Sequence, residues 1–240
     1  MESPLTQFKV KTLIPIHIGG VDLSFTNASL FMVLSAVAII AFLAIGLRKK
    51  SLIPGRMQSL VEMAYELVSG MLQENAGSEG KRYFPFVFSL FLFVLFGNLL
   101  GMIPYAFTFT SQIILTFGLA TIVFVAVTAI GFIRHGLKFF KFFLPEGAPL
   151  FMAPILIPIE VISYLSRPVS LSVRLFANMM AGHTMLKVFA LFTVLLGAYG
   201  ISTILLNTVL IGFEVLVAFL QAYVFSVLTC LYLSDAIHMH

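Results

Sequence analysis

Charged residues are scarce in this 240-residue sequence: only 10% of the residues are Asp, Glu, Lys or Arg, whereas 60% are hydrophobic. Soluble proteins average about 25% charged residues, so a soluble domain of this length would have too few charges to cover its surface. The net charge of +4 reflects a shortage of acidic residues rather than a basic cluster, which argues against nucleic-acid binding. The composition indicates a polytopic membrane protein.

Cysteine is also nearly absent, since the chain contains only Cys230. A single thiol excludes an internal disulfide, and its position in an apolar run is typical of a packing residue. The sequence has no H-E-x-x-H or C-x-x-C pattern, and we expect neither a metal site nor a cofactor. We find no internal repeat, so the inverted-repeat plan of many transporters has no support here.

Long apolar runs define the membrane segments, because about 20 apolar residues cross a bilayer as a helix. We predict an all-α polytopic protein with a single membrane domain over residues 1–240 and about five membrane-embedded helices. An additional amphipathic helix at 54–72 is expected at the membrane surface or on a partner. The predicted spans are 23–47, 83–105 and 111–133, followed by two long tilted helices, 159–195 and 201–233, that form a hairpin.

The connecting segments carry most of the positive charge. Six Lys and Arg residues lie between the first two spans and three follow the third span, so both groups are expected on the cytoplasmic or equivalent side. Residues 75–80 are expected to form a polar turn. Four prolines between residues 142 and 158 predict an irregular connector, and a further break is expected near residues 197–200.

Six charged residues interrupt the apolar sequence of the last 94 residues and are candidates for function: Glu160, Arg167, Arg174, Lys187, Glu214 and Asp235. A central Arg costs about 2.5–3.5 kcal/mol on insertion scales unless it is paired or meets water. Glu160, Arg167 and Arg174 are spaced by seven residues and therefore share one helix face, on or near which Ser170 and Asn178 also lie. Arg174 has no acid within one turn, so we expect its partner to lie outside its own helix.

A second polar surface surrounds His183, which lies on the opposite side of the helix from Arg174. On the last helix, Asn207, Glu214 and Gln221 are spaced by seven residues and share a face. Glu214 can face either surface, depending on packing. Structural alternatives stay open at this point: Glu160 neutralising Arg167, helix–helix hydrogen bonds of Asn178 and Gln221, and His183 as a satisfied buried histidine.

The segment Arg174-Leu-Phe-Ala-Asn178-Met-Met-Ala-Gly-His183 resembles the signature of subunit a of F-type ATP synthases. The preceding segment from Ser166 to Val173, the segment Leu220-Gln221-Ala-Tyr-Val-Phe and the segment Asn98-Leu-Leu-Gly101-Met-Ile-Pro104 extend this resemblance over most of the chain. The family is the stator half of a proton-driven rotary motor, and it does not itself hydrolyse ATP.

The resemblance implies a role for each candidate residue. The last two helices would lie as a tilted hairpin against a ring of c subunits, with Arg174 facing the ring carboxylate and separating two proton half-channels. Gln221 would sit close to Arg174. Asn178, His183 and Glu214 would line the outer half-channel, and Glu160 and Ser170 would belong to the cytoplasmic path. The implied partners are the c-subunit ring, the peripheral-stalk b subunits and the rest of the ATP synthase complex, within a lipid bilayer.

The sequence departs from many bacterial family members at two positions. They carry an acid where His183 stands and a histidine where Glu214 stands, whereas this exchanged pair is similar to that of mitochondrial and alphaproteobacterial members. The exchange keeps one acid and one imidazole and leaves two roles for His183, proton relay or the ordering of water. A bacterial inner membrane is favoured over a mitochondrial one.

Two other functions fit the composition. A self-contained proton-coupled transporter or channel predicts ion flux from the purified chain alone. A membrane scaffold, in which the charges serve only as helix contacts, predicts that Arg174→Gln is tolerated.

Overall fold

The computed structural model describes residues 8–15, 17–18, 21–22, 24–48, 53–103, 106–136, 139, 150–196 and 200–238, most of which are helical. Within these residues, five helical stretches are long and apolar enough to cross a membrane. They are Asn27–Gly46, Arg56–Gly101, Ile113–His135, Ala153–Leu196 and Ile201–Ile237. The predicted class, an all-α polytopic membrane protein, is confirmed.

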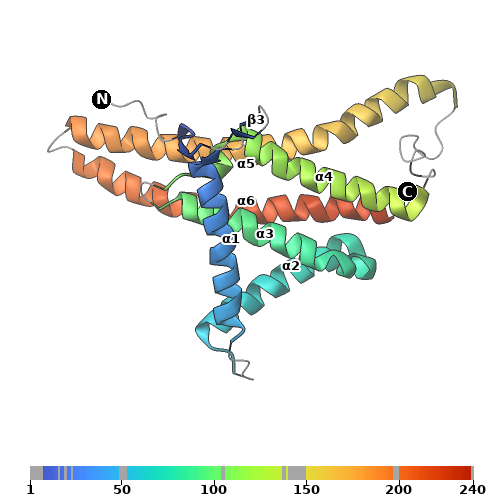
Figure 1. Ribbon diagram of the computed structural model, residues 1–240, viewed down its shortest axis with the longest axis horizontal. Helices are drawn as coiled ribbons and strands as arrows, with labels where there is room; N and C mark the ends of the chain where they lie inside the picture. Colours follow the sequence, from blue (N-terminus) through green and yellow to red (C-terminus); the bar gives the residue numbers. More distant parts are fainter. Residues whose placement is uncertain are drawn as a thin grey trace.

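Short strands, which the sequence analysis did not predict, precede the first helix. β1 (Thr12–Ile14) pairs antiparallel with β4 (Phe25–Thr26), and β2 (His17–Ile18) pairs with β3 (Val21–Asp22). Helix α1 (Asn27–Gly46) follows directly, because the Thr26 side chain accepts a hydrogen bond from the Ser29 N–H and caps the helix. Figure 1 shows α1 running at a large angle to α3, α4 and α6.

The second helical stretch is interrupted by a kink at Gly77. α2 (Arg56–Gly80) continues through a short 3₁₀ turn, η2 (Lys81–Tyr83), into α3 (Phe84–Gly101). The polar turn predicted at 75–80 is present as a kink. The residues on either side of Gly77 are helical, but Gly77 has φ 65° and ψ −162°, a non-helical conformation that favours glycine, and the chain changes direction there. α2 therefore extends beyond the amphipathic segment expected at 54–72.

The third span is close to its predicted range, as α4 covers Ile113–His135 after a 3₁₀ turn, η3 (Phe109–Ser111). An ion pair between Arg134 and Glu79 joins the end of α4 to the end of α2. The His135 imidazole Nε2 lies 3.2 Å from the carbonyl oxygens of Ala236 and Ile237, the last residues of α6 (Ile201–Ile237). These contacts join α2, α4 and α6 at one end of the molecule.

The irregular connector predicted up to residue 158 is too long. After a 3₁₀ turn at Leu150–Met152, helix α5 begins at Ala153 and runs to Leu196, with Pro158 and Pro168 inside it. Proline is tolerated in such helices where neighbouring groups satisfy the freed backbone carbonyls. Residues 142–149 of the predicted connector, and residues 197–199 of the break predicted before α6, lie outside the described residues.

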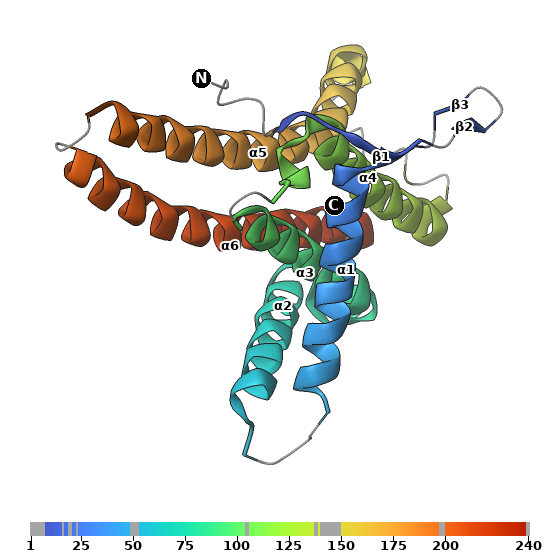
Figure 2. The same ribbon diagram turned by 60° about the vertical axis from the view of Figure 1, so that its left-hand side comes forward.

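Helix α6 is the centre of the packing, since it contacts α2, α3, α4 and α5. Phe91 of α3, Leu171 and Leu175 of α5, and Ala222 and Phe225 of α6 are buried in one shared core. Figures 1 and 2 show the later, orange part of α5 running beside α6, with the end of α5 and the start of α6 extending away from α1 and α2. The fold therefore presents a long helical hairpin, of which one half is packed in the bundle and the other half projects from it.

Candidate functional site

Arg174 lies on α5 with an exposed side chain, and it makes no ion pair with any residue that the structure describes. Ser170, one turn earlier, is also exposed, and Glu160 is half-buried near the start of α5. Neither Ser170 nor Glu160 has a hydrogen bond or ion pair with a described side chain. The structure thus leaves the guanidinium of Arg174 accessible from outside the chain.

Asn178 connects the two long helices one turn after Arg174. Its Nδ2 donates a hydrogen bond of 2.7 Å to Oε1 of Gln221 on α6. Gln221 is buried, with 3% of its surface exposed, and its Nε2 has no hydrogen-bond partner among the described residues. The contact holds the Gln221 amide within one helical turn of the Arg174 position, and it is the helix–helix bond that the sequence offered as a structural alternative.

His183 faces Glu214 across the hairpin. His183 Nδ1 lies 3.3 Å from Glu214 Oε1, and Glu214 is only 4% exposed. Both carboxylate oxygens are buried, and neither forms a hydrogen bond with a described residue. A Cβ atom at Gly182 would lie 2.7 Å from Glu214 Oε1, so glycine makes room for the carboxylate. Of the two surfaces that Glu214 could have faced, the packing selects the one around His183.

Thr108 completes this cluster from the segment between α3 and α4, and sequence reasoning missed it. Its Oγ1 lies 2.9 Å from His183 Nε2 and donates a hydrogen bond of 3.0 Å to the Gly101 carbonyl oxygen. Asn98, in the quoted segment of α3, donates from Nδ2 to the Ala218 carbonyl oxygen at 3.2 Å. No spacing pattern could have indicated Thr108, because its partner is 75 residues away in the sequence.

The polar face of α6 is incompletely hydrogen-bonded. Asn207 Oδ1, both oxygens of Glu214 and Gln221 Nε2 are buried atoms without hydrogen-bond partners among the described residues. Most buried polar side-chain atoms in folded proteins are paired with protein or with ordered water. Three such residues at seven-residue spacing on one helix therefore form a line of buried polar atoms that ordered water would satisfy.

Arg167 has a different environment, although it lies on the same helix as Arg174. Its Nη1 is 2.9 Å from Asp235 Oδ2 on α6, and its guanidinium carbon lies 5.1 Å and 5.0 Å from the ring centres of Tyr164 and Tyr232. The Tyr164 hydroxyl in turn contacts Thr128 Oγ1 at 2.7 Å. The sequence offered Glu160 as the neutralising acid, but the structure pairs Arg167 with Asp235.

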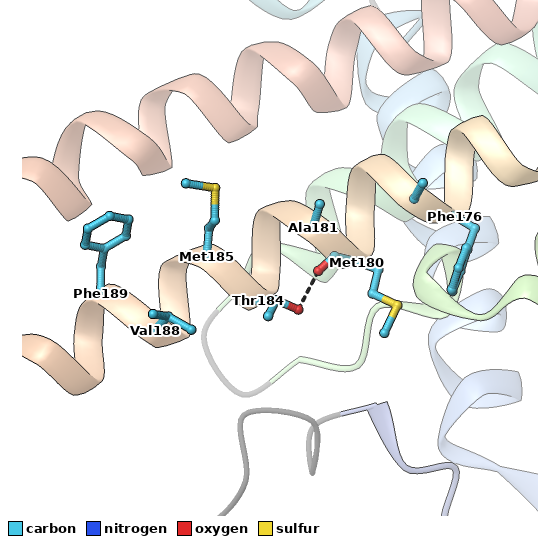
Figure 3. Close-up of a pocket in the computed structure, with 8 residues that line it drawn as sticks. Phe176, Met180, Ala181, Thr184, Met185, Val188 and Phe189 are labelled. Carbon is cyan, nitrogen blue, oxygen red and sulfur yellow. Dashed lines mark hydrogen bonds between the residues drawn. The ribbon is translucent and has the colours of Figure 1, made fainter.

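An apolar groove of about 700 Å³ runs along α5 beyond Arg174. Figure 3 shows the side chains that line it, from Phe176 to Phe189, with the Thr184 hydroxyl donating to the Met180 carbonyl oxygen. No titratable side chain lines the groove, so the titratable groups of α5 lie on its other surfaces. Among the described residues, no group of three or more His, Cys, Asp or Glu side chains could hold a metal ion, and Cys230 is buried.

These features define a class of protein: a polytopic membrane protein whose two longest helices meet through polar side chains inside membrane-length segments. Residues 29–234 match the model of the family described as ATP synthase A chain. The chain belongs to this family of ATP synthase subunit a proteins.

Relatives with the same name align over nearly the whole chain. ATP synthase subunit a of Pelagibacter ubique is 56% identical over 240 residues, covering 99% of this chain and 98% of the relative. The subunits of Paramagnetospirillum magneticum and Rhodospirillum rubrum are 54% and 55% identical, with full coverage of both chains. The resemblance identified from the sequence motifs is confirmed.

Proposed function

We propose that this protein is the stator subunit a in the membrane sector of an F-type ATP synthase, where it couples proton flow to rotation of a c-subunit ring and so to ATP synthesis. It is a non-catalytic subunit, and the partners are the c ring, the peripheral-stalk b subunits and the rest of the complex. The proposed location is a bacterial inner membrane, in keeping with the bacterial relatives.

The exposed side chain of Arg174 carries this proposal. A protonated ring carboxyl is neutral and can move through lipid, whereas an ionised one is costly there unless a cation faces it. Arg suits this position because it stays charged at any working pH, while a desolvated Lys can lose its proton. The fixed charge also opposes a direct leak of protons between the two half-channels, so that each proton must travel with the ring.

The polar contacts of α5 and α6 support the outer half-channel. Asn178 with Gln221, and His183 with Glu214, form two successive steps along the hairpin toward Arg174. Both steps carry buried polar atoms that no described residue satisfies, as expected of groups that exchange protons with water. Glu160 and Ser170, on the other side of Arg174 along α5, are assigned to the cytoplasmic half-channel.

Arg174→Ala tests the proposal in the assembled complex. We expect ATP synthesis driven by an imposed proton gradient to fall below detection. A proton that crosses 100 mV releases about 2.3 kcal/mol, and without Arg174 this free energy is not coupled to rotation of the ring. The subunit composition of the complex, measured on immunoblots of membranes, should stay normal, since the exposed Arg174 has no described ion-pair partner.

Arg167→Ala is the matched control, because it removes the other arginine of α5 seven residues earlier. Its charge is paired inside the chain with Asp235, so the synthesis rate per assembled complex should remain near the wild-type rate. Normal ATP synthesis in Arg174→Ala would overturn the proposal. Proton flux through the purified chain without a ring would favour the self-contained transporter instead.

A further inference from the structure

We propose that Thr108 is a positioning residue that holds His183 in the tautomer protonated at Nε2, so that the bare Nδ1 faces Glu214 and can take up a proton from it. The inference rests on the proposed half-channel and deepens it, because it makes His183 a proton relay rather than only an orderer of water. Thr108 lies outside the long helices, in the segment that precedes α4.

The Thr108 hydroxyl has one proton and can therefore donate only one hydrogen bond. The Gly101 carbonyl oxygen at the end of α3 is a helix-terminal acceptor without an intrahelical donor. The hydroxyl donates to it at 3.0 Å. With its proton directed to Gly101, Thr108 Oγ1 accepts in its 2.9 Å contact with His183, and the donor is Nε2–H.

The other ring nitrogen of His183, Nδ1, faces Glu214. A neutral imidazole carries one N–H, so protonation at Nε2 leaves Nδ1 as an acceptor. Nδ1 lies 3.3 Å from Glu214 Oε1, and two bare acceptors at this distance repel each other. One proton between them removes the repulsion, either on Oε1 or on Nδ1.

Transfer of this proton is balanced without any other reactant. When it moves from Glu214 Oε1–H to His183 Nδ1, the O–H bond breaks, the N–H bond forms, and a carboxylate faces an imidazolium. Thr108 continues to accept from Nε2–H in both states. Among the described residues, the charged or titratable groups near His183 are Glu214 from α6 and Lys187 from α5, whereas α3 and the segment containing Thr108 contribute uncharged groups.

Two glycines keep this geometry open. A Cβ atom at Gly101 would lie 2.6 Å from Thr108 Oγ1 and Cγ2, and one at Gly182 would lie 2.7 Å from Glu214 Oε1. Gly101→Ala therefore displaces the hydroxyl without removing it. It provides a second way to disturb the tautomer, independent of any change at residue 108.

Nitrogen-15 NMR of the histidine-labelled complex in membranes reads the tautomer directly, with the His183 signals assigned by their loss in His183→Gln. We expect the neutral wild-type ring to be protonated at Nε2 and bare at Nδ1. Thr108→Val should give a mixture of both tautomers, and Thr108→Ser should restore the single form. A neutral wild-type ring protonated at Nδ1 would overturn the inference, and this measurement needs no variant of Thr108 to assemble.

The pH profile of proton pumping separates positioning from packing. At alkaline pH we expect Thr108→Val to lower flux about threefold, which is the effect of one lost neutral hydrogen bond. The loss should shrink as the pH falls, because an imidazolium carries both protons and has no tautomer to choose. Gly101→Ala should follow the same trend and Thr108→Ser should match wild type. A loss of equal size at every pH, or no recovery in Thr108→Ser, would show a structural role only.

Arg174→Ala and Glu214→Gln, measured in the same assay, separate this inference from the proposed function. If both pump at the wild-type rate, the proposed half-channel fails, whatever the tautomer of His183. If both lose flux while Thr108→Val pumps normally at every pH, the half-channel stands and the positioning role of Thr108 is wrong.

Discussion

The contact between α5 and α6 has two regions, and the polar groups are paired in one of them and lack hydrogen-bond partners in the other. In the region of Asp235, the charge of Arg167 is paired at 2.9 Å and covered by the rings of Tyr164 and Tyr232. In the region of Glu214, buried atoms of Glu214 and of Gln221 have no hydrogen-bond partner among the described residues. Both regions lie on the same two helices, but the Arg167–Asp235 pair is partly exposed whereas Glu214 and Gln221 are buried.

Under the proposed function, the Asp235 region serves the stability of the helix pair and the Glu214 region serves proton transfer. Ionised groups in a membrane protein pair with one another when their role is to hold helices together. Polar atoms left without a protein partner cost free energy, and they are kept where they exchange protons or meet another molecule. Changes near Asp235 should therefore affect assembly and spare proton flux per complex, whereas changes near Glu214 should do the reverse. Variants in the two regions test this difference between assembly and proton flux.

The largest effect in the Glu214 region is expected for Glu214→Gln. The amide keeps the shape of the side chain but cannot take up and release a proton, so proton flux should fall by about a hundredfold, a typical contribution of a positioned acid or base. ATP-driven acidification of inverted membrane vesicles measures this flux. Wild-type pumping by Glu214→Gln would remove Glu214 from the proton path.

Gly182→Ala should displace the Glu214 carboxylate by steric contact. The added Cβ would approach Glu214 Oε1 to 2.7 Å, and the displaced carboxylate would no longer face His183. We expect flux to fall about tenfold, since small misplacements of a reacting group are costly. Gly212→Ala on α6 is the control, because no atom lies within 4 Å of the added Cβ. An equal loss in both variants would mean that helix rigidity, rather than the position of Glu214, is responsible.

Gln221→Leu should have a smaller effect. It removes the acceptor of the 2.7 Å hydrogen bond from Asn178, and the loss of one neutral hydrogen bond predicts a decrease in flux of about threefold. Thr229→Val is the control on the same helix, because the Thr229 hydroxyl donates only to the Phe225 carbonyl oxygen of its own helix. If the two variants pump equally, the Asn178–Gln221 contact is structural.

Asp235→Asn should have the smallest effect on flux and should act on stability instead. Both side chains of the Arg167–Asp235 pair are partly exposed, at 21% and 44%, so the pair should contribute about 0.2–1 kcal/mol. A double-mutant cycle with Arg167→Gln, measured by thermal denaturation of the solubilised complex, gives this coupling. Loss of flux per assembled complex in Asp235→Asn would break the division between the two regions.

Helix positions could be predicted from the sequence because apolar runs and bilayer thickness determine them. The faces shared by Asn207, Glu214 and Gln221 followed from helical spacing alone. Which helix each face meets could not be derived, because spacing determines the angle around one helix axis but not the rotation of one helix against another. The choice between His183 and Arg174 as the neighbour of Glu214 therefore required the structure.

Two further features escaped prediction for separate physical reasons. Pro158 suggested an irregular segment, but α5 includes it, since membrane helices tolerate internal proline. Asp235 lies far from Arg167 in the sequence, whereas Glu160 lies at helical spacing on the same helix. The nearer acid was the natural candidate, but the pairing is decided by how the ends of α5 and α6 are packed.

The backbone of Gly77 also has a geometric consequence for the whole chain. The helical stretch Arg56–Gly101 contains 46 residues, and as a straight rod it would be about 69 Å long, more than twice the roughly 30 Å hydrocarbon thickness of a bilayer. A Cβ at residue 77 would touch nothing within 4 Å, yet the φ of 65° disfavours any side chain. Space is thus not the constraint at this position. The torsion angles of Gly77 determine where the helical stretch changes direction, and so the length of helix that remains to cross the membrane.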